Sequence, residues 1–178
     1  PMTSEPEVFA AITLIGEAFA GSGPNAAHLN VLIGRKGGPV ETAWATSLAT
    51  PRAGYIPFLA VLRPNLPVKP MTLFVNKADL RGAQHEQLTW GPAQAGVAAG
   101  VTQAVADGLI PADAADDVLV IAAVWVDWAA DDAAVVFANN RAATRDAIAA
   151  AVRGEPAVAD VVAEVGHPWN AYYHEHRN

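Results

Sequence analysis

The chain has 178 residues and a net charge of −7, and 52% of its side chains are apolar while 16% are charged. The charged fraction lies below the roughly 25% of a typical soluble domain, which favours a homo-oligomer that hides part of its surface. An acidic chain without a run of Lys and Arg argues against nucleic-acid binding. The absence of cysteine excludes disulfides, thiolate metal ligands and a cysteine nucleophile.

No segment is apolar over the length of a membrane span. The longest apolar run, residues 118–126, covers about half of such a span and is bounded by Asp117 and Asp127. The first residues are polar and acidic, without the basic start and apolar run of a signal peptide. We therefore expect a cytoplasmic protein with no membrane contact.

A hairpin of two strands opens the predicted fold. Residues 8–20 predict the first strand, with Gly16 as a possible bulge, and residues 27–33 predict the second. Between them, the turn Gly21-Ser-Gly-Pro-Asn-Ala26 loosely resembles a dinucleotide-binding fingerprint. Because a strand and not a helix follows, a turn is the better interpretation.

One helix and two strands follow the hairpin. Pro39 near a first turn predicts a helix over residues 40–49. Strands are predicted over 58–62 and 71–75, with the Pro-containing segment 64–67 as a rigid connector between them.

The second half of the chain predicts two helices around a central strand. Helices are predicted over 92–107 and 139–153, because each segment ends at a glycine. Residues 118–128 are apolar on both faces, which indicates a central strand. Residues 78–90 show no clear period, and 158–165 predict a last short helix or strand.

This order of elements predicts an α/β (α+β) domain, in which helices pack on a mixed sheet without regular double winding. No Pro- or Gly-rich linker divides the chain, so we expect one domain over residues 7–166 and a C-terminal tail over 167–178. Aromatic side chains of the tail, such as Trp169, could cap a neighbouring subunit or pack on their own subunit.

His28 is the candidate acid–base residue. It enters a strand directly after the turn, and Asn30 lies two residues further on the same face. A histidine on a half-buried strand is more often structural, but imidazole ordinarily titrates near neutral pH and suits proton transfer. Asn76 and Lys77, at the end of a strand, are also placed to reach a site, with solvent exposure as the alternative.

A metal site is not expected. His85 lacks a second histidine four residues later, so the zinc-protease pattern is missing. His174 and His176 lie in the polar tail, where such pairs are usually solvated. The acidic pairs 116–117 and 131–132 flank the central strand and most simply mark its ends.

Several motifs in one order resemble the formaldehyde-activating enzyme family. The first is Asn25-Ala-Ala-His-Leu-Asn-Val-Leu-Ile-Gly34, and the densest is Pro64-Asn-Leu-Pro-Val-Lys-Pro70. Gly91-Pro-Ala-Gln94 and Gly108-Leu-Ile-Pro-Ala-Asp113 follow. With the remaining motifs, the resemblance extends from about residue 10 to residue 156, which is nearly the whole domain.

The resemblance implies a lyase of one-carbon metabolism. Family members condense formaldehyde with tetrahydromethanopterin, a reduced pterin cosubstrate, to give the methylene-bridged pterin and water. They bind no metal or prosthetic group, and their fold is similar to domain 2 of ribosomal protein S5. They form ring-shaped homopentamers, with the pterin between neighbouring subunits.

By the same resemblance, His28 matches the proton donor, and Leu59, Lys77 and Gln94 match positions that contact the pterin. A protonated imidazole suits this chemistry because hydroxide is a poor leaving group. Its proton lets water leave the carbinolamine of formaldehyde and a pterin amine, and the second amine captures the resulting iminium.

Two positions depart from the family pattern. Asn30 stands where the family has an acidic residue, and Asp79 stands where it has Thr. Asn30 can still hydrogen-bond a pterin amide, whereas Asp79 could neutralise Lys77 or repel an acidic ligand. We place both residues with the substrate-binding set, since the two changes suggest an altered ligand. We expect a lyase that condenses formaldehyde, or a related small aldehyde, with tetrahydromethanopterin or a similar reduced pterin carrier.

Two other functions stay open. The first is a non-catalytic protein that senses or stores a carrier or an aldehyde on the same scaffold. The second is aldehyde transfer to a sugar phosphate, which fused family members with a second domain suggest. The sequence shows no second domain that would support this last interpretation.

Overall fold

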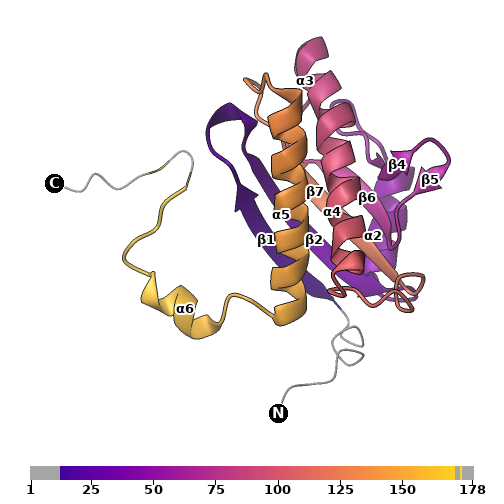
Figure 1. The fold of residues 1–178 in the computed structure, drawn as a ribbon, viewed down its shortest axis with the longest axis vertical. Coiled ribbons are helices and arrows are strands. Elements are labelled where there is room, and N and C mark those ends of the chain that lie inside the picture. The colour runs from indigo at the N-terminus through magenta and orange to yellow at the C-terminus, as the bar shows by residue number, and fades with distance from the viewer. Residues whose placement is uncertain (1–12, 171–172, 174–178) are drawn as a thin grey trace.

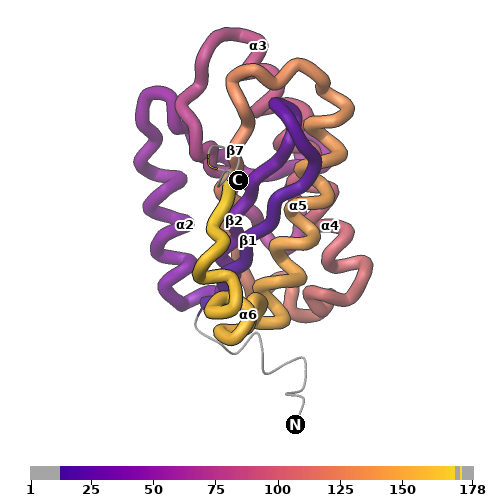
Figure 2. Tube along the Cα trace, turned by 90° about the vertical axis from the view of Figure 1, so that its left-hand side faces the viewer, coloured from indigo at the N-terminus to yellow at the C-terminus, as the bar shows by residue number. Residues whose placement is uncertain are grey.

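A computed structural model of the chain describes residues 13–170 and 173, and helices pack on both faces of its sheet (Figure 1). Helices α4 (Gln94–Ala106) and α5 (Ala133–Arg153) cover one face. Helix α2 (Pro39–Ala49) packs on the other face and covers only part of it. Figure 2 shows α2 on one side of the strands and the α4–α5 pair on the other.

The sheet has five strands in the order β1-β2-β7-β6-β3. Strands β1 (Leu14–Ala20), β2 (Ala27–Arg35) and β7 (Val118–Trp125) pair antiparallel, and β7 pairs parallel with β6 (Met71–Asn76). The short β3 (Phe58–Leu59) forms the far edge. The predicted mixed sheet, the hairpin and the central place of β7 are confirmed, whereas the likeness to ribosomal protein S5 stays a prediction.

Gly16 is not a bulge, because the β1–β2 register runs without a shift from Leu14 opposite Ile33 to Ala20 opposite Ala27. The glycine is needed for a different reason. A Cβ atom there would lie 1.9 Å from the backbone oxygen of Ala147 on helix α5. Gly16 therefore lets α5 approach the edge strand closely.

The predicted strand over residues 58–62 is divided at Ala60. Its second part, β4 (Val61–Arg63), leaves the main sheet and pairs with β5 (Leu66–Pro67) in a small separate hairpin. Asn65 turns this hairpin with a positive φ of 65°. The segment 64–67 is therefore a turn and a strand, and not a rigid connector.

The segment without a clear period is helical. Helix α3 (Gly82–Leu88) continues through a π-helical turn (Thr89–Ala93) into α4. The helix predicted to begin at residue 92 thus begins ten residues earlier. Pro92 lacks a backbone N–H and ordinarily breaks an α-helix, which is why the sequence predicted a start there.

Helix α5 also begins earlier than predicted. The Asp132 side chain accepts hydrogen bonds from the backbone N–H groups of Ala134 (2.9 Å) and Val135 (3.0 Å), so it caps the helix. Gly154, with a φ of 66°, ends it as expected. Beyond it, the short helix α6 (Val158–Ala163) is exposed.

The two sheet faces differ in burial. Leu29, Val31 and Ile33 of β2 are completely buried beneath α4 and α5. On the opposite face, α2 covers a smaller cluster that includes Leu73 and Ile121. Among the described residues, no helix covers the remainder of that face, toward the start of β2. Within the described residues, no helix combines the length and apolar character that crossing a membrane requires.

Candidate active site on the open sheet face

Four polar side chains form a cluster on the uncovered part of the sheet: Glu17 of β1, His28 and Asn30 of β2, and Lys77 directly after β6. Glu17 lies opposite Asn30 in the antiparallel register, so Glu17 and both β2 side chains point to the same face. Lys77 reaches the same place because its backbone N–H donates to Val124 of the central strand (2.8 Å).

The His28 ring is held at both nitrogen atoms. Its Nε2 lies 2.8 Å from Oε1 of Glu17, and its Nδ1 lies 3.3 Å from Nζ of Lys77. A carboxylate can only accept, so Nε2 carries the hydrogen and donates to Glu17. In the neutral ring, the lone pair of Nδ1 then faces the Lys77 amine.

Lys77 has an unusual environment for a lysine. Its Nζ donates to Oδ1 of Asn30 at 2.7 Å. Burial lowers the pKa of Lys77 to about 8, and the nearby negative charge of Glu17 opposes this change. Asn30 accepts the hydrogen bond without a negative charge of its own, so it stabilises the ammonium form less than a carboxylate would.

The cluster is open to ligands. The His28 side chain keeps 41% of its surface exposed, so the ring is not sealed inside the subunit. Phe19 and Trp125 lie opposite His28 on the two neighbouring strands, and Phe19 is 51% exposed. Aromatic rings on both sides of an accessible imidazole suit a flat, partly apolar ligand.

Leu59 and Gln94 lie away from this cluster. The buried Gln94, at the start of α4, accepts a hydrogen bond through Oε1 from the backbone N–H of Val61 (2.5 Å). Leu59 pairs with Leu73 at the β3 edge, two strands beyond the central β7. The structure therefore brings His28, Asn30 and Lys77 together, but not Leu59 or Gln94.

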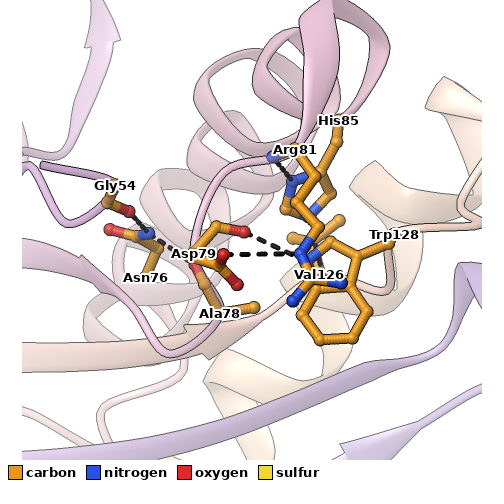
Figure 3. A network of polar contacts seen from close by, with 8 residues as sticks. All are labelled: Gly54, Asn76, Ala78, Asp79, Arg81, His85, Val126 and Trp128. Atoms are coloured by element: carbon orange, nitrogen blue, oxygen red, sulfur yellow. Dashed lines mark hydrogen bonds and ion pairs between the residues drawn. The ribbon is translucent and has the colours of Figure 1, made fainter.

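Asp79 belongs to a second network, which Figure 3 shows. Its carboxylate lies 3.4 Å from Nε of Arg81, and its backbone oxygen accepts from Nε1 of Trp128 (3.0 Å). The Arg81 guanidinium stacks 3.6 Å from the centre of the Trp128 ring. The carboxylate that acts on the pKa of Lys77 is Glu17, and a role of Asp79 in ligand binding stays a prediction.

Asn76 is structural and does not reach the site. It is buried, and its Nδ2 donates to the backbone oxygens of Gly54 and Ala78, both at 2.6 Å (Figure 3). It thereby ties the loop before β3 to the turn that follows β6.

His85 has a structural place in the described part of the chain. His85 is buried, with Nδ1 accepting from the Arg81 backbone N–H (3.2 Å) and Nε2 facing the Val126 oxygen (3.0 Å). In the part of the chain that the structure describes, no three His, Asp or Glu side chains gather as metal ligands. His174 and His176 lie outside those residues.

A hollow of about 420 Å³ lies between α4 and α5, where Phe137, Arg141 and Arg145 are among the lining residues. It opens on the helical side of the sheet and is separate from the His28 cluster. Its charged groups already have partners, since Arg145 pairs with Asp107 (2.7 Å) and Arg141 bonds Gln103 (2.7 Å).

Glu17 is the site residue that the sequence analysis missed. The signal was present, because a strand hairpin with a short turn places a residue near the end of the first strand beside the start of the second. Taken together, fold and cluster define an α+β protein with an accessible imidazole and a partly buried amine side by side on the exposed face of its sheet.

Comparisons with known proteins identify the family. The formaldehyde-activating enzyme family model matches residues 15–172. A 5,6,7,8-tetrahydromethanopterin hydro-lyase of Methanosarcina barkeri is 45% identical over 88% of this chain and 90% of that protein. A bifunctional enzyme Fae/Hps of Methanococcoides burtonii is 42% identical over 85% of this chain but only 38% of its own length. The chain belongs to the formaldehyde-activating enzyme family.

Proposed function

We propose that this protein condenses formaldehyde with tetrahydromethanopterin, releasing water and leaving a methylene bridge on the pterin. The hydro-lyase relative, similar over almost the full length of both chains, supports this substrate pair. The observation that carries the proposal is the accessible His28 imidazole, held between a carboxylate and an amine.

His28 acts as the general acid in this proposal. A pterin amine adds to formaldehyde to give a carbinolamine, whose hydroxyl leaves as water once the imidazolium donates a proton. The iminium that remains is closed by the second pterin amine, and the proton released on closure returns to the imidazole. Glu17 stabilises the charged imidazolium, because its carboxylate lies 2.8 Å from Nε2.

A second copy of the chain completes the site in this proposal. Leu59, on the edge strand β3, and Gln94, which starts α4 and bonds the nearby Val61, match pterin-contacting positions of the family but lie away from His28. We propose a homopentamer in which that edge of one subunit faces the His28 cluster of the next. Sedimentation that shows a monomer would contradict this assembly, and the cytoplasmic location stays a prediction.

The test measures formaldehyde consumption with tetrahydromethanopterin, and separately with tetrahydrofolate as an alternative carrier. Loss of a general acid typically costs 10²–10⁴-fold in rate, and we expect a fall of about this size for His28→Ala. His167→Ala is the matched control, because His167 is exposed beyond α6. Equal rates for wild type and His28→Ala would reject His28 as the acid.

A carrier-binding protein without turnover is the second candidate. The departures at Asn30 and Asp79 favour it, because both change the charge of a matched site position. Tight binding of the pterin by wild type, unchanged in His28→Ala and without aldehyde consumption, would support this function over the first.

A further inference from the structure

We propose that Lys77 is a nucleophile, which takes up formaldehyde as a covalent iminium on Nζ and passes the carbon to the carrier amine. This inference rests on the proposed function and keeps its overall reaction and the role of His28 as the acid. It changes one feature of the route, because water leaves a carbinolamine on Lys77 and not a carbinolamine on the pterin. It assigns chemistry, and not only ligand contact, to the lysine beside His28.

The contacts of Lys77 distinguish it from the other two lysines of the chain. Lys69 forms an ion pair with the carboxylate of Asp116, and Lys36 donates to the backbone oxygen of Asp116. Lys77 has an amide oxygen and an imidazole nitrogen as its partners. Among the described residues, no carboxylate forms an ion pair with it.

Burial favours the neutral amine of Lys77, which is the reactive form, and no ion pair within the described residues opposes this effect. With the pKa of Lys77 at about 8, roughly a tenth of the side chain is uncharged at pH 7, whereas an ordinary lysine is uncharged in fewer than about one molecule in a thousand. Glu17 raises this pKa, but its oxygen is already engaged by His28 at 2.8 Å.

His28 is placed to receive the proton that Lys77 must lose. The lone pair of Nδ1 faces Nζ at 3.3 Å, so an ammonium proton can pass directly to the ring. The imidazolium that forms keeps its hydrogen bond to Glu17 through Nε2. One transfer therefore prepares both a free amine and an acid next to it.

The covalent step balances with these groups alone. Nζ attacks formaldehyde, the carbon–oxygen π bond breaks, and a proton moves from nitrogen to oxygen to give the carbinolamine. The imidazolium then donates its proton from Nδ1 to the hydroxyl, the carbon–oxygen bond breaks, and water leaves the iminium. A carrier amine adds to that carbon and passes its proton to Nζ, the bond from carbon to Nζ breaks, and Lys77 recovers its neutral amine. The carbon leaves as an iminium on the carrier, and the proton released when the second carrier amine closes the bridge returns to Nδ1 of His28.

Asn30 sets the charge of Lys77 in this scheme. A carboxylate at the same place would lie within hydrogen-bond distance of Nζ, since Oδ1 of Asn30 is 2.7 Å away, and would hold the ammonium form. Asn30→Asp should therefore slow adduct formation on Lys77 without removing the amine.

The experiment traps the adduct without any carrier. The full-length protein is mixed at pH 7 with limiting formaldehyde and cyanoborohydride, which reduces an iminium to a stable N-methyl group, and peptide mass mapping then locates the methyl group. We expect Lys77 to be methylated at least about tenfold faster than Lys36 and Lys69. Asn30→Asp should reduce the Lys77 rate about tenfold and leave the other two unchanged.

The outcomes separate this step from the proposed function. Methylation of Lys77 no faster than that of Lys36 and Lys69, together with normal turnover of tetrahydromethanopterin, would overturn the covalent step while the function stands. Fast methylation of Lys77 without turnover of the pterin would support the nucleophile and reject the function. Lys77→Arg keeps the charge but cannot form the adduct, so unchanged turnover in that variant would also overturn the step.

Discussion

The two faces of strand β2 show how one segment serves stability and chemistry at once. Leu29, Val31 and Ile33 point toward α4 and α5 and are completely buried. His28 and Asn30, alternating with them, point to the open face and contact Glu17 and Lys77. Because side chains of a strand alternate with a period of two, substitutions on one face should affect folding, and those on the other should affect activity.

The largest expected effect is on the covered face, at Gly16. In Gly16→Ala the new methyl group would lie 1.9 Å from the Ala147 oxygen and 2.9 Å from the Ala151 side chain. Overpacking of this kind costs about 1–3 kcal/mol, and we expect a loss near 3 kcal/mol because the first contact is with backbone. Urea denaturation measures it.

The control is one residue away on the same strand. Ile15 points to the open face and is 67% exposed in the subunit, so Ile15→Ala should change the free energy of unfolding by less than about 0.5 kcal/mol. Equal losses in the two variants would contradict the comparison between the faces.

On the open face, Glu17→Gln should reduce the turnover rate about tenfold, which corresponds to about 1.4 kcal/mol of activation free energy. The neutral amide can still accept a hydrogen bond from Nε2 of His28, but it stabilises the imidazolium less than the carboxylate does. The free energy of unfolding should stay unchanged, since the Glu17 side chain is 57% exposed. Steady-state kinetics and denaturation on the same samples check both. A stability loss without a change in turnover would assign Glu17 to folding.

A smaller effect is expected at the start of α5, in the helical layer of the covered face. Asp132→Ala removes the cap that two backbone N–H groups use, which should cost about 1 kcal/mol of unfolding free energy. Asp132→Asn should cost almost nothing, because asparagine caps helices equally well. Similar losses of unfolding free energy in both variants would show that the negative charge of Asp132 stabilises the helix, and not its hydrogen bonds as a cap.

The smallest effect is a pH dependence that Lys77 introduces. Its pKa falls from 10.5 to about 8 on folding, so between these values the unfolded chain binds more protons and stability rises with pH. Below pH 8 the lysine is charged in both the folded and the unfolded chain, so burial of this charge lowers the free energy of unfolding by its full amount. Between pH 7.5 and 10.5, the free energy of unfolding of wild type should rise by less than about 1 kcal/mol relative to that of Lys77→Met. The rise is small because solvent screens a partly exposed group. If the unfolding free energy of wild type fell relative to that of Lys77→Met as the pH rises, the lowered pKa would be contradicted.

Local pattern predicted much of the fold and part of the site. The β1–β2 hairpin, the central β7 and the glycine ends of α4 and α5 follow from alternation, apolar runs and turn residues. His28, Asn30 and Lys77 come together because strand order, and not sequence distance, sets their separation. That order cannot be read from local pattern, which named the three residues as candidates but did not place Lys77 beside the other two. The family resemblance assigned them to one site.

The errors have physical causes as well. Residues 78–90 hide a helix because a π turn shifts the phase of its buried positions, and Pro92 ordinarily marks a helix start. The beginning of α5 was missed because Asp131 and Asp132 were interpreted as the end of a strand, although Asp is also a preferred helix cap. Glu17 was missed because its importance depends on a partner across the hairpin.

The π-helical turn between α3 and α4 also sets the direction of Gln94. A regular helix rotates by about 100° per residue, and a π turn holds one residue more than an α turn. His85 before the turn and Gln94 after it are both buried, and the extra residue allows both to face inward along one axis. Shortening this turn by a single residue would therefore force one of the two side chains out of its contacts, with the helix itself still intact.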